Sequence, residues 1–348
     1  MEHAAEGPVL AVDLGGTQIR AALITPDRTV HCRRAAQSRD EAGVDAVVGR
    51  MIEMASAVRD EAITEGLPPP IGIGIAAPGP LDPWRGIVLG PPNLKGWRNV
   101  PLAEMVSDAL EMPVIVERDT NVAVMGEWRY GAARGTRHAI YITVSTGVGG
   151  GVITDERLLV GVLGGAGEAG HTTVEIDGPR CGCGGVGHVE AIASGTALAR
   201  EGRALLDQRL SEGLARLATT DVEVDARLVA RAAAAGDEAC TALLERAWVA
   251  IGAMCASLAN LFDPEVIVLG GGIAEHSPRL FEVVRDELER RALPGPGGRV
   301  RIEAARLGGD VSLVGSLPIV NERIGDPAYR RRSQESRTAT TQQGAPHS

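Results

Sequence analysis

Residues 9–24 read VLAVDLGGTQIRAALI, which is an apolar run, a glycine turn and a second apolar run. The two apolar runs predict strands joined as a hairpin. A turn of the Asp-x-Gly-Gly-Thr type leaves backbone N–H groups uncovered by side chains, so phosphate oxygens approach them closely. Asp13 at the strand end is placed to face a hydrated magnesium ion, and Thr17 to donate its hydroxyl. The stretch therefore predicts a phosphate-binding hairpin.

The same pattern occurs a second time. An apolar strand over 139–144 runs into the turn STGVGGG at 145–151 and then into a returning strand. This echo predicts an internal duplication, and a further glycine run, 270–272, follows a predicted strand at 266–269. One glycine turn alone is weak evidence, but two echoing turns and a triple glycine are more specific. The chain shows neither a Walker A motif nor a GxGxxG opening a helix, which disfavours P-loop and dinucleotide-binding folds.

The remaining elements follow from apolar periodicity. Helices are predicted over 40–65, 194–217, 225–235, 237–262 and 278–292, and further strands over 71–76 and 114–116. The uncharged run 247–262 is shorter than the roughly 20 residues that span a bilayer, so we interpret it as a buried helix. After Gly325 the chain becomes polar and basic, which predicts a disordered tail.

Composition sets wide limits on function. The chain has 348 residues, of which 44% are hydrophobic and 23% charged, as in soluble globular proteins large enough for two domains. Its net charge of −10 argues against a nucleic-acid surface. No signal peptide is visible at the start of the sequence. The five cysteines are sparse and odd in number, which favours reduced thiols and a cytoplasmic location.

A compact set of metal ligands lies in residues 171–190, HTTVEIDGPRCGCGGVGHVE. Two imidazoles and two thiolates, from His171, Cys181, Cys183 and His188, suit tetrahedral zinc, and the glycines between them allow a tight loop. The alternative is a flexible glycine loop with two chance cysteines. All four positions would be filled by protein, so the zinc is predicted to be structural, with Glu168 and Glu190 positioned beside it.

Several motifs occur together in the order found in the ROK (repressor, open reading frame, kinase) family of sugar kinases. The chain resembles this family over about residues 8 to 325. The matching motifs are DLGGT at 13–17, APGP at 77–80, PNL at 92–94 with Trp97, Asp119-x-Asn121, STGVGGG at 145–151, Gly167-Glu168-x-Gly170-His171, CGCG at 181–184 and LGGG at 269–272.

The resemblance implies an actin-like, ribonuclease H-like α/β fold of two domains with an interdomain cleft. A small N-terminal domain would comprise 8–117, joined by 311–325, and a large domain with the zinc loop would comprise 118–310, followed by the tail 326–348. ATP with Mg²⁺ would be bound by Asp13, Gly15, Gly16, Thr17, Thr146, Gly147, Gly270, Gly271 and Gly272. A hexose would be bound by Gly79, Asn93, Arg118, Asp119, Glu168, His171 and Glu190.

Asp119 matches the family's catalytic base. The role is chemically reasonable, because attack of a sugar hydroxyl on the γ-phosphate needs a carboxylate that accepts the proton. Two residues depart from the family pattern. His188 replaces the usual third cysteine, and Arg118 replaces the usual asparagine before the base. If Arg118 faces the sugar it should favour a neutral hexose over a cationic amino sugar; the alternative is that it pairs with Glu117 or Glu127.

Three classes of function are compared. The first is an ATP-dependent hexokinase, most simply one that converts glucose to glucose 6-phosphate. Other acceptors would be fructose, N-acetylmannosamine, N-acetylglucosamine or kanosamine, and polyphosphate is a second possible donor. A repressor is disfavoured, since the first strand begins at Val9 and leaves no room for a helix-turn-helix domain. The third class is a non-catalytic sugar-binding regulator. The resemblance also implies a homodimer or homotetramer, with no nucleic-acid or membrane partner.

Overall fold

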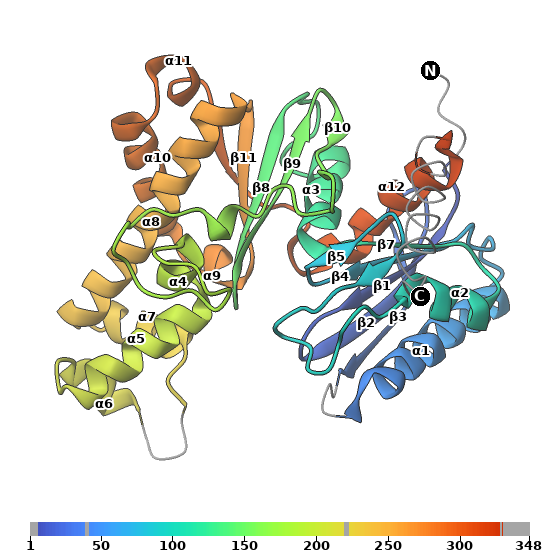
Figure 1. The fold of residues 1–348 in the computed structure, drawn as a ribbon, viewed down its shortest axis with the longest axis horizontal. Coiled ribbons are helices and arrows are strands. Elements are labelled where there is room, and N and C mark those ends of the chain that lie inside the picture. The colour runs from blue at the N-terminus through green and yellow to red at the C-terminus, as the bar shows by residue number, and fades with distance from the viewer. Residues whose placement is uncertain (1–5, 39–41, 219–222, 328, 330–348) are drawn as a thin grey trace, which may run out of the picture. The chain divides into compact units, whose positions relative to one another are not determined.

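The computed structural model describes residues 6–38, 42–218, 223–327 and 329. The chain divides into two compact units (Figure 1). The first comprises Met1–Arg129, Val160–Ala166 and Gly309–Ser348, and the second Tyr130–Leu159 and Gly167–Gly308. The first unit extends past the predicted boundary at residue 117, because the helix that begins at Asp119 follows its strand without a break.

The first unit is built on a five-stranded sheet in the order β3-β2-β1-β4-β7. The first three strands form antiparallel pairs, whereas β1, β4 and β7 run parallel to one another. The strands are β1 (Val9–Leu14), β2 (Gln18–Ile24), β3 (Val30–Gln37), β4 (Ile73–Ala77) and β7 (Val114–Arg118), and β5 (Leu81–Asp82) pairs with β6 (Ile87–Val88) in a small separate ribbon.

Helices cover both faces of this sheet. They are α1 (Val44–Thr64), α2 (Leu102–Leu110), α3 (Asp119–Tyr130) and α12 (Val311–Gly325), with a short 3₁₀ turn, η3 (Gly308–Asp310), before the last. On one face α1 and α2 pack over a core that includes Leu10, Met51 and Trp97. On the other face α12 packs on β1 and β4. It lies so close that a Cβ on Gly74 would come within 2.9 Å of Ser316.

The second unit repeats this topology in the sheet order β10-β9-β8-β11-β12. As in the first unit, an antiparallel hairpin is followed by two parallel strands. The echo of strand, glycine turn and strand in the sequence therefore corresponds to a repeated fold. The strands are β8 (Ala139–Val144), β9 (Val148–Thr154), β10 (Arg157–Leu158), β11 (Val266–Gly270) and β12 (Arg301–Ala304).

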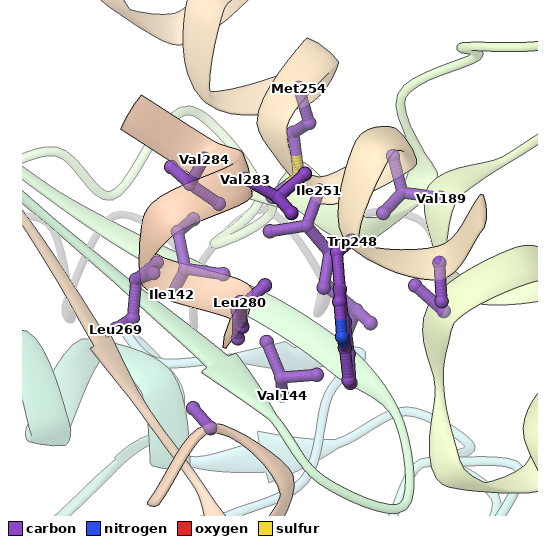
Figure 2. Close-up of a cluster of buried hydrophobic side chains, with 14 of the residues drawn as sticks. Ile142, Val144, Val189, Trp248, Ile251, Met254, Leu269, Leu280, Val283 and Val284 are labelled. Carbon is purple, nitrogen blue, oxygen red and sulfur yellow. The ribbon is translucent and has the colours of Figure 1, made fainter. Parts of the chain in front are cut away.

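Helices of the second unit bury its core. They are η2 (Ala169–His171), α4 (Val189–Ala193), α5 (Gly195–Asp207), α6 (Glu212–Leu217), α7 (Ala226–Ala234), α8 (Glu238–Phe262), α9 (Gly272–Glu275), α10 (Pro278–Arg291) and α11 (Pro294–Gly297). Figure 2 shows Trp248, Ile251 and Met254 of α8 packed with Val283 and Val284 of α10.

Among the described residues, α8 is the one helix with the length and hydropathy of a membrane span. Its apolar side chains instead make a large part of the core, with Ile251, Met254 and Cys255 fully buried. This agrees with the interpretation of 247–262 as a buried helix.

Two predicted helices need correction. The helix predicted over 194–217 is two helices, because Arg209 adopts φ 57° and Ser211 accepts a hydrogen bond from the N–H of Leu214 to begin α6. The helix predicted from Asp40 begins at Val44, and residues 39–41 lie outside the described part of the chain.

The disordered tail was predicted from residue 326. Residues 328 and 330–348 lie outside the described part, so the structure does not address them. Tyr329 is described and packs on the first unit: its hydroxyl donates to the carbonyl oxygen of Pro83 (2.9 Å), and its ring centroid lies 5.7 Å from that of Trp84. The prediction was wrong there because composition does not reveal what one aromatic residue contacts.

The crossing of α12 and α3 provides a test of the fold. A Cβ on Gly315 would lie 2.1 Å from the carbonyl oxygen of Val122, so Gly315→Ala forces the two helices apart. We expect a loss of stability of at least about 1–3 kcal/mol, the usual cost of overpacking, seen as a lower Tm. Gly325→Ala, at the end of the same helix with no atom within 4 Å, should leave Tm nearly unchanged. Equal Tm values for the two variants would contradict the close crossing.

Candidate active site

The first glycine turn lies at the carboxyl end of β1 and is fixed by its own backbone. The N–H of Gly15 donates to the carbonyl oxygen of Gln18 (2.9 Å). Ser38, the residue after β3, holds the turn from the side. Its N–H donates to the carbonyl oxygen of Thr17 (2.9 Å) and its hydroxyl to that of Gly16 (2.6 Å). Thr17 itself is exposed. The turn is thus preorganised and leaves Thr17 exposed for an anion.

Asn93 lies against this turn. A Cβ on Gly16 would come 3.1 Å from the carbonyl oxygen of Asn93 and 3.4 Å from its Nδ2. Leu94 and Trp97, each 2% exposed, anchor the segment in the core, while Asn93 is exposed. The structure therefore brings together a predicted phosphate-binding turn and a predicted sugar-binding residue.

Asp13 is paired with a cation that the sequence analysis did not consider. Arg20 is its direct cross-strand partner on β2, and its Nε donates to Asp13 Oδ2 at 2.9 Å. The same guanidinium donates to the carbonyl oxygen of Gly309 just before α12. Arg20 therefore holds the Asp13 carboxylate in place beside the turn.

Asp119 is the first residue of α3 and directly follows β7. Its side chain is exposed, and its Oδ1 accepts a hydrogen bond from the N–H of Thr120 at 2.7 Å. A carboxylate at a helix N-terminus is stabilised by the helix dipole in its ionised form. The geometry gives a carboxylate that is fixed at the helix N-terminus and open to solvent. Gly79, another predicted sugar-binding residue, lies two residues after the end of β4 and is half-buried.

Arg118 is only 2% exposed. Its Nη2 donates to Asn121 Oδ1 at 3.1 Å and to the carbonyl oxygen of Ala166. Ala166 is the last residue of the segment 160–166 of the first unit, and the chain continues into the second unit with Gly167 and Glu168. The guanidinium is thus already bound by protein acceptors. Glu117, one of the partners considered from the sequence, is bound by Arg323 of α12 and by the side chain of Asn121.

In the second unit the four predicted zinc ligands come together. One nitrogen or sulfur atom from each of His171, Cys181, Cys183 and His188 lies within 4.8 Å of the others. Cys181 Sγ is 3.7 Å from His171 Nδ1, and Cys183 Sγ is 3.2 Å from His188 Nδ1. Zinc–sulfur bonds of about 2.3 Å and zinc–nitrogen bonds of about 2.0–2.1 Å separate tetrahedral ligands by about 3.6 Å. The cluster fits one such ion.

Burial raises the pKa of the Cys181 thiol. Without a metal, this thiol would therefore be protonated more readily than an ordinary cysteine. Zinc binds the thiolate, so a bound ion would remove that proton. The site suits zinc because of its four donor atoms and their spacing. The protonation of the Cys181 thiol in the absence of metal does not decide this.

Glu190 connects this cluster with the second glycine turn. Its Oε2 accepts a hydrogen bond from the N–H of Val148 (3.1 Å), and Cys181 Sγ lies 3.8 Å from its Oε1. A Cβ on Gly147 would come 2.7 Å from Oε2, and one on Gly170 would come 1.8 Å from the carbonyl oxygen of Val148. Glycine is needed at position 170, where the clash is with backbone, whereas a side chain at position 147 would displace the carboxylate of Glu190.

The 270–272 glycines lie beside the same turn. Gly270 pairs with Thr143 in the parallel ladder of β11 and β8. Gly271 has φ 90°, and a Cβ there would come 2.6 Å from the carbonyl oxygen of Val144. On the other side of the turn, the N–H of Gly195 donates to Ser145 (2.8 Å). The predicted phosphate-binding segments around Thr146 and Gly271 are therefore neighbours within this unit.

Comparison with known proteins assigns the family. The model of the ROK family matches residues 9–323. The chain belongs to the ROK family. Its two repeated α/β units correspond to the actin-like fold that the resemblance implied.

Relatives with similar sequences cover nearly the whole chain. A glucokinase of Thermotoga maritima is 34% identical over 317 residues, which are 91% of this chain and 98% of that protein. A ROK hexokinase structure from Thermus thermophilus has a TM-score of 0.74 at 35% identity, covering 89% of this chain and 96% of that one. A ROK glucokinase from Streptomyces griseus, solved with glucose and AMPPNP, has a TM-score of 0.76 at 32% identity, covering 90% and 99%.

Three charged residues that form pairs beside this site were not predicted as site residues. These residues are Glu117, Arg323 and Arg20. Glu117 could have been noticed, because it lies just before the motif Asp119-x-Asn121. A charged residue inside an apolar strand, such as Glu117 after Val116, is rare without a partner. That signal could have identified Glu117, but not the partner 206 residues further along the chain.

The Glu190 contact leads to a prediction on the turn of this ROK protein. Glu190→Ala removes the acceptor of the Val148 N–H, and hydrogen bonds to charged groups contribute about 1.5–3 kcal/mol. Exchange of the Val148 amide should accelerate by about tenfold or more in hydrogen-exchange measurements. Glu175→Ala, which removes the partner of Arg246 elsewhere on the same loop, should not change it. Unaltered protection of Val148 in Glu190→Ala would rule out the contact.

Proposed function

We propose that this protein transfers the γ-phosphoryl group of ATP to glucose and forms glucose 6-phosphate. The chain is a kinase that phosphorylates a hexose; the proposal concerns the sugar and the role of each residue. The observation that carries it is Asp119, an exposed carboxylate fixed at the start of α3, in a chain 34% identical to a glucokinase. The complex of the Streptomyces griseus enzyme with glucose and AMPPNP supports the same pair of substrates.

ATP is assigned to the glycine turns, whose backbone amides suit phosphate oxygens. The residues proposed to bind it are Gly15, Gly16, Thr17, Thr146, Gly147, Gly270, Gly271 and Gly272. Asp13 would bind hydrated Mg²⁺, which neutralises charge on the β- and γ-phosphates. The fixed turns and the position of Asp13 beside the first of them support this assignment.

The sugar is assigned to groups that exchange hydrogen bonds with hydroxyls. Glu168, His171 and Glu190 would bind it from the second unit, and Gly79, Asn93 and Asp119 from the first. For Arg118, the protein acceptors that already bind its guanidinium favour an indirect role, in which it fixes Ala166 two residues before Glu168. This weakens the expectation that Arg118 itself selects against amino sugars.

In the proposed reaction Asp119 accepts the proton of the sugar 6-hydroxyl as that oxygen bonds to the γ-phosphorus. The bond from the γ-phosphorus to the bridging oxygen breaks, and ADP leaves with that electron pair. The backbone amides of the turns hold the phosphates in line, so positioning and electrostatics supply most of the catalysis.

The zinc loop would be structural, with His171, Cys181, Cys183 and His188 filling all four positions. Because His171 Nδ1 lies toward Cys181, zinc binding through Nδ1 leaves Nε2 for the sugar. All five cysteines are free thiols, which supports a reducing, cytoplasmic location. A homodimer or homotetramer remains a prediction.

The role of Asp119 as the base is tested by Asp119→Asn. The amide has nearly the size of the carboxylate and can still accept the hydrogen bond from Thr120, but it does not accept the proton of the sugar hydroxyl. We expect kcat for glucose with ATP and Mg²⁺ to fall by at least ~10²-fold, with glucose binding measured by calorimetry retained. Asp108→Asn, an exposed aspartate of α2, serves as the control. A panel of fructose, N-acetylmannosamine, N-acetylglucosamine, kanosamine and polyphosphate identifies other acceptors and donors. Near-normal turnover by Asp119→Asn would refute the assignment.

The zinc site is tested by alanine substitutions of two glycines in the same loop, Gly185 and Gly182. A Cβ on Gly185 would lie 2.2 Å from Cε1 and 2.5 Å from Nε2 of His188, whereas one on Gly182 meets nothing within 4 Å. Gly185→Ala should therefore displace His188 and weaken zinc binding by about 10–100-fold, measured by chelator competition. Gly182→Ala should bind about one zinc per chain, as the wild type does. Absence of zinc from active wild-type protein, or equal affinities of the two variants, would contradict the site.

A further inference from the structure

Glu117 is a fully buried carboxylate next to the proposed base. Its side chain is 0% exposed, and a charge in such a place is strongly destabilising unless it is paired and hydrogen-bonded. Oε1 accepts from the N–H of Arg118 (2.9 Å) and from Asn121 Nδ2 (3.0 Å). Oε2 accepts from Nη2 of Arg323. Arg118 directly precedes Asp119 and Asn121 follows two residues later, so Glu117 binds the chain on both sides of the base.

Arg323 is itself held from several sides. It lies on α12 and is 8% exposed. Its guanidinium carbon is 5.2 Å from the ring centroid of Tyr329 and 5.9 Å from that of Trp84, so it lies within the range of cation–π attraction to both rings. Burial raises the pKa of Tyr329, so its phenol keeps the proton that it donates to Pro83. The aromatic residues thus fix the partner of Glu117.

We propose that Glu117 and Arg323 are positioning residues for Asp119. Because Glu117 holds the backbone before Asp119 and the side chain after it, and Arg323 holds Glu117, α12 sets the orientation of the catalytic carboxylate. The proposal rests on the proposed role of Asp119 as the base. A small displacement of a catalytic group lowers the rate of the chemical step more than it lowers substrate binding.

The first test compares two adjacent residues of α12. Arg323→Met removes the partner of Glu117, and Glu117→Gln weakens the same pair. Glu322→Gln is the matched control, because Glu322 is the neighbour of Arg323 on α12 but pairs at the surface with Arg129 of α3 rather than with Glu117 of β7. We expect kcat to fall at least about tenfold in the first two variants, with KM for glucose and ATP changed less than about threefold. The control should keep the wild-type kcat.

A purely structural role would lower Tm in Arg323→Met and leave the kcat of the folded enzyme unchanged, and this result would overturn the proposal. If Arg323→Met does not fold, Arg323→Lys replaces it, since lysine keeps the charge but loses the planar group that lies against the rings. Its kcat should fall about threefold or more at unchanged KM, and a wild-type kcat would overturn the proposal.

The second test is a double-mutant cycle with Asp119→Asn. If Arg323 acts through Asp119, Arg323→Met should cause little further loss of kcat in the Asp119→Asn background. Losses that multiply would show that Arg323 acts elsewhere and would overturn the positioning role. Failure of the proposed function is distinguishable, because it would appear as absence of hexose phosphorylation in the wild type or as near-normal turnover by Asp119→Asn alone.

Discussion

Each sheet keeps its earliest strand at the centre, between an antiparallel strand on one side and two successive parallel strands on the other. This arrangement places the carboxyl ends of β1, β4 and β7 at one edge of the first sheet, and those of β8, β11 and β12 at one edge of the second. The glycine turns and Asp119 all follow such ends. A parallel sheet therefore gathers groups that are far apart in sequence at one edge, and the proposed phosphate-binding turns and Asp119 depend on this pairing.

Within the second unit, close backbone packing joins the metal cluster to the glycine turn. The segment 188–196 begins at His188, a proposed zinc ligand, carries Glu190 against Val148 and ends with amides bound to the turn. Since glycines remove the side chains that would separate these segments, a shift of the loop is transmitted through backbone contacts rather than through compressible side chains. The loop thus supports the turn as well as its own ligands.

Local patterns predicted the parts of the site whose chemistry is local in sequence. The hairpin at Asp13 and the Cys181–Cys183 loop are contiguous motifs, so spacing was enough to find them. The pairing of Glu117 with Arg323 and the docking of Tyr329 depend on tertiary contacts between distant segments. The break between α5 and α6 depends on a left-handed Arg209, a conformation that its residue type does not favour.

The placement of α12 has a consequence for biosynthesis. Gly72, just before β4, and Gly74 on β4 leave room for Ile324 and Ser316, so one face of the first sheet is covered by the last described helix of the chain. A ribosome delivers β1–β7 long before α12 emerges from its exit tunnel. During that interval the apolar face of the nascent sheet has no cover, while the second unit has all its own strands and helices. The second unit is therefore able to complete its fold first, and the N-terminal unit only after α12 has emerged.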